Sequence, residues 1–132
     1  MRVFVDSGPF IALLDRSDQH HASAREAMAR MGDVRLITSL FVLGEVAGRG
    51  VRLVGARPTS DFIRKILSSP LFHVVDVGLQ AVEEALEALL KFEDQGLSFV
   101  DATNVVLMRA ARTRKIFSFD GGFRKAGFDL LP

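Results

Sequence analysis

Short runs of consecutive apolar residues alternate along this chain with longer segments in which apolar residues recur every three or four positions. Continuous runs are typical of strands covered on both faces, and the longer period is typical of helices packed on one side. The runs predict strands at residues 2–5, 34–38, 72–77, 115–119 and 128–131. The periodic segments predict helices at residues 9–15, 19–31, 40–54, 59–68, 79–94 and 99–113. Such alternation is typical of an α/β fold with a parallel sheet.

The length of the chain, 132 residues, predicts a single domain over residues 1–132 with one core. No apolar run reaches the roughly 20 residues that a membrane-spanning helix needs, so we expect no membrane segment. The first predicted strand begins at Arg2, and we therefore expect no signal peptide. Cysteine is absent, which excludes disulfides and thiolate metal sites and is consistent with a cytoplasmic protein.

Four carboxylates adjoin apolar segments of the kind that form a core: Asp6, Glu45, Asp101 and Asp120. We expect each at the end of a buried element, where an ionised carboxylate is costly unless it is paired or binds a metal. Asp6 and Asp120 each follow a predicted strand directly, so they belong at carboxyl ends of strands, where open α/β sheets bind ligands. If the fold brings the four together, they require a cation. The sequence alone does not give the strand order, so their convergence is a hypothesis.

Three of these acids also have structural explanations. Asp101 and Ser98 match a capping box, in which each side chain accepts a hydrogen bond from the backbone of the other. Asp6 and Asp120 each precede residues typical of turns. Glu45 lies among apolar residues within a predicted helix and has the weakest structural explanation. Each acid alone leaves both interpretations open, and the four together favour a site.

Several carboxylates in one pocket cannot all be ionised without compensation. Two unit charges about 4 Å apart repel by roughly 4 kcal/mol at an effective dielectric constant of about 20, so divalent ions or raised pKa values are required. Oxygen ligands, without cysteine or a well-placed histidine, favour hard cations such as Mg²⁺ or Mn²⁺ over Zn²⁺. We interpret His20 and His21 as a solvated helix start and His73 as a core histidine, so no histidine is assigned to the site.

The net charge of +1 does not by itself indicate nucleic acid, but basic residues are concentrated in two stretches. The first contains Arg49, Arg52, Arg57, Arg64 and Lys65, and the second contains Arg109, Arg112, Arg114, Lys115, Arg124 and Lys125. Each stretch lies downstream of one or more of the four acids. Solvated helix surfaces explain such residues, and a polyanion passing a cation site explains them as well.

At these residues the chain resembles the PIN-domain family, and specifically the compact VapC-type toxins. The resemblance covers essentially the whole chain and depends on four motifs whose order and spacing agree with the family. They are Val3-Phe4-Val5-Asp6-Ser7, Thr38-Ser39 followed by Val42-Leu43-Gly44-Glu45-Val46, Leu97-Ser98-Phe99-Val100-Asp101-Ala102, and Phe117-Ser118-Phe119-Asp120-Gly121-Gly122-Phe123.

The resemblance implies a three-layer α/β/α sandwich around a parallel five-stranded sheet in the order 3-2-1-4-5. It implies that the four acids form the catalytic and metal-binding set, with Mg²⁺ or Mn²⁺ held mainly by Asp6 and Asp101, often with Asp120. Glu45 would orient or deprotonate the attacking water, or bind a second ion. Polar positions that match the family's supporting residues are Ser7, Ser39, Ser118 and, more loosely, Asn104.

The implied activity is that of a metal-dependent endoribonuclease that cuts structured RNA such as tRNA or rRNA. The resemblance further implies a toxin with a cognate antitoxin protein lying over the active-site edge, and a homodimer. Two alternatives are a non-catalytic PIN scaffold that binds RNA or protein, and a housekeeping RNA-processing nuclease. A phosphotransfer receiver is not supported, because the first strand is followed by Asp6 alone and the third ends at Val77-Gly78 without a phosphate-accepting Asp.

Overall fold

A computed structural model describes the chain over residues 1–132 and contains one parallel sheet of five strands in the order β3-β2-β1-β4-β5. The strands are β1 (Arg2–Val5), β2 (Arg35–Ser39), β3 (Phe72–Val75), β4 (Lys115–Phe117) and β5 (Asp129–Leu131). The predicted fold class and strand order are therefore confirmed. The central strand β1 is the most deeply covered, and Val3, Phe4 and Val5 have no exposed surface. Covered parallel strands are expected to be apolar throughout, as these are.

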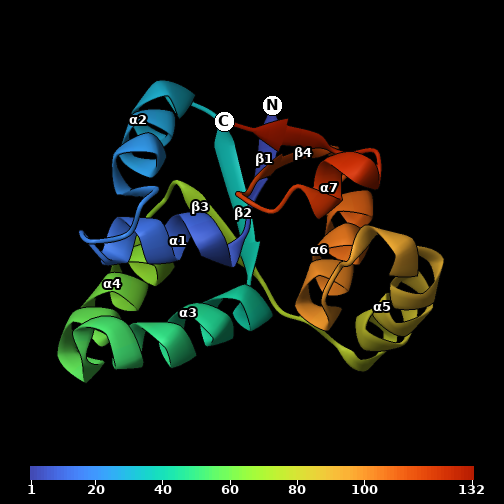
Figure 1. Cartoon of the computed structure of the whole chain (residues 1–132), viewed down its shortest axis with the longest axis horizontal. Coiled ribbons are helices and arrows are strands. Elements are labelled where there is room, and N and C mark those ends of the chain that lie inside the picture. The colour runs from blue at the N-terminus through green and yellow to red at the C-terminus, as the bar shows by residue number, and fades with distance from the viewer.

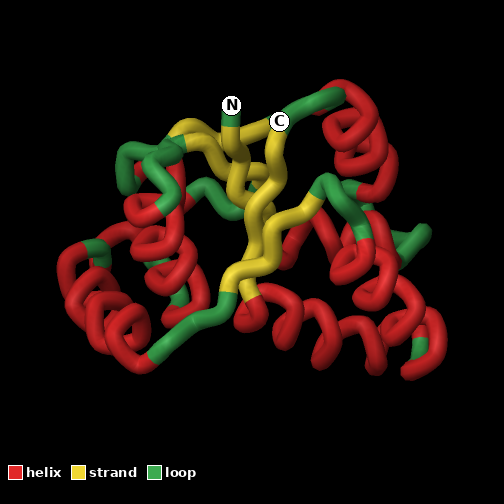
Figure 2. Tube along the Cα trace, turned by 180° about the vertical axis from the view of Figure 1, so that it is seen from behind, coloured by secondary structure: helices red, strands yellow, loops and turns green.

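Helices cover both faces of the sheet, which gives three layers (Figures 1 and 2). Four helices follow β1 and β2 on one face: α1 (Ser7–Leu14), α2 (His21–Met31), α3 (Leu40–Val54) and α4 (Ala56–Ser68). The other face carries α5 (Leu79–Lys91), α6 (Phe99–Ala110) and the short α7 (Gly122–Lys125), with a 3-10 turn at Glu93–Gln95. Of these, α6 lies against the sheet and α5 packs on α6 (Figure 1). None of the helices combines the length and the apolar character required to cross a membrane.

The tight packing of α3 against α4 and α1 depends on one glycine. A Cβ added at Gly50 would lie 2.7 Å from Oγ1 of Thr59 and 2.9 Å from Cδ2 of Leu14, both closer than a van der Waals contact allows. Thr59 itself is buried and donates a hydrogen bond to the carbonyl of Gly55. The three helices are therefore packed tightly against one another near the C-terminal ends of α1 and α3.

Several predicted boundaries differ from the structure by two or three residues, and two differences affect the surroundings of the acids. The fourth strand ends at Phe117 and not at residue 119, because the chain turns where the Ser118 hydroxyl accepts a hydrogen bond from the backbone N–H of Asp120. The helix α7 was not predicted at all. This helix of four residues begins at Gly122. A Cβ at Gly122 would lie 2.8 Å from the carbonyl oxygen of Gln95, so packing requires glycine at this position. In the sequence the same glycine indicates a loop, and the helix was therefore missed.

Candidate active site

The carboxyl ends of β1 and β4, together with the N-terminal parts of α3 and α6, bring the four predicted acids into one region. Asp6 follows β1, and its backbone N–H donates to the carbonyl of Phe117 at the end of β4. Glu45 lies in the second turn of α3, which starts directly after β2, and Asp101 lies in the first turn of α6. The charges also act on one another: Glu45 raises the pKa of Asp6, and Asp6 and Asp120 both raise the pKa of Asp101.

Asp6 is the most enclosed of the four acids, with 5% of its surface exposed. The hydroxyl of Ser118 donates to its Oδ2 at 2.8 Å, and Nδ2 of Asn104 donates to its Oδ1 at 3.1 Å. Burial raises the pKa of Asp6, and hydrogen bonds from the Ser7 backbone and from these two side chains oppose that rise without cancelling it. No cationic side chain is among the groups that shift its pKa.

Asp101 has two roles, since the predicted capping box is present. Its Oδ2 accepts from the Ser98 backbone N–H at 2.9 Å, and its own N–H donates to the Ser98 hydroxyl at 3.1 Å. The box leaves Oδ1 without a hydrogen-bond partner. Burial raises the pKa of Asp101 to about 6, hydrogen bonds from Ser98 oppose the rise, and the charges of Asp6 and Asp120 add to it. A helix-capping residue is thus also an acid under electrostatic strain.

Glu45 is half-buried on α3. Burial raises its pKa, a hydrogen bond from the Ser7 side chain lowers it, the charge of Asp101 raises it again, and Arg49 lowers it. Arg49 is therefore the only cation among the groups that shift the pKa of Asp6, Glu45 or Asp101.

Asp120 differs from the prediction, because its side chain is exposed and not buried. Its Oδ1 accepts from the backbone N–H of Gly122 at 2.9 Å, which is the turn geometry that its sequence context indicates. It remains close enough to raise the pKa of Asp101 by its charge. The four carboxylates Asp6, Glu45, Asp101 and Asp120, called the acid group below, therefore have a buried centre at Asp6 and Asp101 and an exposed edge at Asp120.

The supporting polar residues do different work. Ser39 is buried and caps α3, with its hydroxyl accepting from the Val42 backbone N–H at 3.1 Å, and it forms no hydrogen bond with an acid. Ser118 joins Asp6 to Asp120 through its hydroxyl. Asn104 is fully buried, and although its Nδ2 holds Asp6, its Oδ1 has no hydrogen-bond partner. An unpaired amide oxygen beside a buried carboxylate is an unsatisfied acceptor that a cation would satisfy.

The donor set of the site fits a hard divalent ion. Every candidate ligand is an oxygen, and the charge of Asp6 raises the pKa of Asp101 while no cation lowers the pKa of either acid. No three histidine or carboxylate side chains stand close enough to share one ion. That spacing suits Mg²⁺, which keeps several of its waters and is commonly held by only one or two carboxylates.

The histidines were interpreted incorrectly in part. His73 is exposed on β3 and not in the core. His20 and His21 do begin α2, but they are partly buried: Nδ1 of His21 lies 2.7 Å from the carbonyl of Ala12, and the His20 ring stacks on Phe119 with 4.1 Å between ring centroids. Phe119 directly precedes Asp120, so an aromatic pair flanks the exposed edge of the acid group. Only the fold brings these rings together, and nothing in the local sequence indicates the contact.

These features define the class of protein. The family model of the PIN domain matches residues 3–129. The chain belongs to the PIN-domain family, and the family resemblance based on the four sequence motifs is confirmed.

Relatives named as VapC-type ribonucleases match nearly the whole chain. The 23S rRNA-specific endonuclease VapC20 of Mycobacterium tuberculosis is 33% identical over 126 residues, which are 96% of this chain and 95% of that protein. Ribonuclease VapC26 of the same organism is 27% identical over 118 residues, covering 89% of this chain and 86% of that protein. The crystal structure of M. tuberculosis VapC20, a toxin that cleaves the Sarcin-Ricin loop, superposes with a TM-score of 0.87 over 96% of this chain and 95% of that chain, at 32% identity.

A more distant structure shares the fold alone. A chain of VapBC2 from Rickettsia felis, solved with a DNA fragment from their promoter, superposes with a TM-score of 0.68 at 12% identity. The overlap covers 99% of this chain and 98% of that one. The two chains therefore share the same architecture although few of their residues are identical.

Proposed function

We propose that this VapC-type ribonuclease is a metal-dependent endoribonuclease whose active site is the group formed by Asp6, Glu45, Asp101 and Asp120. The observation that carries the proposal is the unpaired burial of Asp6 and Asp101, whose charges oppose one another with no cation to balance them. A cluster of this kind destabilises the free protein and is useful only when a cation occupies it. Mg²⁺ is the ion that the oxygen ligands favour, and Mn²⁺ is the alternative.

The chain's own residues would divide the work. Asp6, fixed by Ser118 and Asn104, and the free Oδ1 of Asp101 would hold the ion directly. Asp120 would act from the exposed edge through its charge and through a water of the ion, since the three carboxylates do not stand close enough to share one ion. A bound divalent ion lowers the pKa of water and neutralises charge that develops on a phosphate. Glu45, whose pKa is raised, would orient or deprotonate the attacking water, because a base works best when its pKa is near the working pH.

The proposed substrate is a structured RNA. The relatives named for 23S rRNA and for the Sarcin-Ricin loop cover this chain almost completely, which supports an rRNA stem–loop ahead of a tRNA. We also propose that the protein is the toxin of a toxin–antitoxin pair, that it works in the cytoplasm as a homodimer, and that a cognate antitoxin binds over the active-site edge. The VapBC2 neighbour supports the antitoxin through shared fold only.

Cleavage of end-labelled rRNA and tRNA by the purified protein tests the proposal. We expect cutting with Mg²⁺ or Mn²⁺, none with EDTA, and a loss of at least about a hundredfold with Asp101→Asn, which removes an ion ligand. Asp94→Asn, at an exposed acid outside the site, is the matched control and should cut normally. If well-folded protein freed of any antitoxin cuts neither RNA, the non-catalytic scaffold becomes the better interpretation. Retained activity in Asp101→Asn would show that the acids have been assigned wrongly.

A further inference from the structure

A basic hollow lies at the far end of α6 from Asp101, where α5 and α6 end and β4 begins. It has a volume of about 500 Å³, and its lining includes the four cations Lys91, Arg109, Arg112 and Arg114, two phenylalanine rings and no acidic residue. Lys91 and Arg109 approach the ring of Phe92, with 5.4 and 5.8 Å to its centroid. Arg114 lies 5.9 Å from the ring of Phe128 and donates a hydrogen bond to the carbonyl of Gly127.

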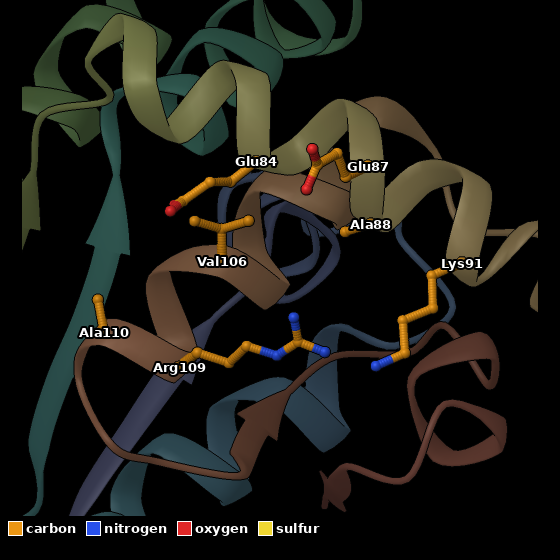
Figure 3. A pocket seen from close by; sticks show the side chains of 7 residues that line it. All are labelled: Glu84, Glu87, Ala88, Lys91, Val106, Arg109 and Ala110. Carbon is orange, nitrogen blue, oxygen red and sulfur yellow. The ribbon is translucent and has the colours of Figure 1, made fainter.

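A neighbouring hollow shows how the charges are arranged around the basic one. Figure 3 shows Lys91 and Arg109 extending from α5 and α6 toward a common space, with Glu84 and Glu87 along the α5 side. Glu84 and Glu87 line this neighbouring hollow and not the basic one, and Asp129 lines a further hollow together with Arg112 and Arg114. Arg109 lies eight residues after Asp101 on α6, which is about 12 Å along the helix axis at 1.5 Å per residue. The basic hollow is thus separate from the acid group but within reach of one extended ligand.

Two of the four cations have an ordinary structural explanation. Lys91 and Arg109 lie in the last turns of α5 and α6, where the helix dipole favours positive charge. That explanation does not extend to Arg112, which lies beyond the last turn of α6.

The backbone of Arg112 is the feature that helix capping does not explain. Its φ is +55°, and it is the only non-glycine residue of the chain with a positive φ. The N–H of Thr113 donates to the carbonyl of Met108 at 3.0 Å, and the N–H of Arg112 donates to that of Arg109 at 3.1 Å. These two bonds form the Schellman motif, in which the position of Arg112 is normally glycine because a Cβ is disfavoured there. An arginine in this position costs stability, so its guanidinium group needs another reason to be there.

We propose that the basic hollow binds the phosphate backbone of the RNA substrate at a point remote from the cleaved bond. The inference rests on the proposed function for its ligand, and on the four cations and the strained Arg112 for its location. Phosphate binding is sequence-independent, so the hollow would add affinity and fix the orientation of the RNA. The position of the cleaved bond would be determined at the acid group. The cations that contact the rings are already positioned, so little side-chain conformational entropy is lost on binding.

Binding of a fluorescein-labelled rRNA stem–loop, followed by fluorescence anisotropy in EDTA, tests the proposal without any cleavage. Arg112→Gly is the informative variant, because glycine suits the backbone while the guanidinium is lost. We expect its melting temperature to stay level or rise, its RNA affinity to fall roughly threefold to tenfold, and the slope of log K against log salt to decrease by about one. Lys91→Ala should weaken binding similarly, and Arg25→Ala, an exposed cation on α2, should bind as the unaltered protein does.

Unchanged affinity and salt slope in both Arg112→Gly and Lys91→Ala would overturn the proposal and leave an acidic protein partner as the ligand for the hollow. A marked fall in the melting temperature of Arg112→Gly would also overturn it, because Arg112 would then be structural. A failure of the nuclease proposal can be distinguished from a failure of this one. In that case the unaltered protein would cut no RNA in Mg²⁺, while the anisotropy measurements in EDTA would still show whether the hollow binds RNA. Where cutting occurs, Arg112→Gly should raise KM and leave kcat unchanged, since it does not touch the acid group.

Discussion

The hydroxyl of Ser118 donates a 2.8 Å hydrogen bond to Oδ2 of Asp6, although the two residues are 112 positions apart in the chain. The parallel pairing of β1 with β4 brings them together at the carboxyl ends of adjacent strands. The same hydroxyl accepts from the backbone N–H of Asp120 at 3.0 Å. One serine therefore orients the most buried acid and sets the turn that carries the most exposed one.

Replacing Ser118 with alanine should reduce activity without abolishing it. Asp6 would lose one of the hydrogen bonds that hold its pKa down, and the turn before Asp120 would lose its acceptor. Residues that support metal ligands typically change affinity or activity by about 10–100-fold. We expect a loss in that range, with a higher Mn²⁺ concentration needed for half-maximal cleavage. Ser68→Ala, at an exposed serine that ends α4, is the control. Normal metal dependence in Ser118→Ala would contradict the orienting role.

Asp101→Asn should stabilise the metal-free protein at neutral pH. Because the pKa of Asp101 is raised from 3.8 to about 6 in the folded state, the native protein holds more protons than the unfolded chain between these values. Its free energy of unfolding therefore falls as pH rises through this window. Asparagine removes this pH-dependent loss of stability, and its side-chain oxygen can still accept the hydrogen bond from the Ser98 backbone N–H. Urea unfolding in EDTA from pH 4 to pH 7 should show the variant gaining on the unaltered protein as pH increases.

The same pair of proteins separates charge from capping. If Asp101→Asn is less stable at every pH by a constant amount, the capping box and not the charge dominates at this position. Mn²⁺ at pH 7 should raise the melting temperature of the unaltered protein much more than that of the variant, since a ligand stabilises only the state that binds it.

Asn104→Asp should make the fold depend on a cation. It would place a second carboxylate at the 3.1 Å contact now made with Asp6, and like charges at about that distance repel by roughly 5 kcal/mol at an effective dielectric constant of about 20. We expect a lower melting temperature in EDTA at pH 7, with recovery on acidification to pH 5 or on addition of Mn²⁺. Gln80→Glu, the same change at an exposed position of α5, should have little effect. A melting temperature that ignores both pH and metal would show that the new acid does not face Asp6.

Two glycines of α3 should respond in opposite directions to alanine. At Gly50 a Cβ would collide with Thr59 and Leu14, so Gly50→Ala should destabilise the protein by about 1–3 kcal/mol, as overpacking does. At Gly48 nothing lies within 4 Å of the added atom, and Gly48→Ala should stabilise the helix by roughly 0.5–1 kcal/mol. Denaturant unfolding of the two variants measures the difference. Equal effects would mean that α4 can move away from α3.

The α/β class followed from the alternation of patterns, whereas the strand order came from the family resemblance, because hydrophobic period does not record which strands pair. The acids were found because each adjoins apolar residues, and this signal was accurate for Asp6 and Asp101, which are 5% and 8% exposed. It was wrong for Asp120, because Phe117 and Ser118 before it are buried while a local turn carries its side chain outward.

Contacts between distant segments were beyond the reach of the sequence. The stacking of His20 on Phe119 joins residues 99 positions apart, and no local pattern indicates it. His73 was wrongly assigned to the core because the other residues of its strand are mostly apolar, which suggested that both faces of β3 are covered. In the structure the His73 side chain is exposed. The positive φ of Arg112 was equally hidden, since sequence context places glycine and not arginine in such a position.

The pairing of the first strand with the fourth also has a consequence in time. Asp6 and Glu45 leave the ribosome well before Asp101, Asn104 and Ser118 have been synthesised, so a growing chain holds half of its acids with nothing to orient them. The arrangement of acids proposed to bind the ion can form only after α6 and β4 have been made and β4 has docked beside β1. Synthesis order alone would then keep an RNA-cutting enzyme of this topology harmless to the ribosome that is still translating it.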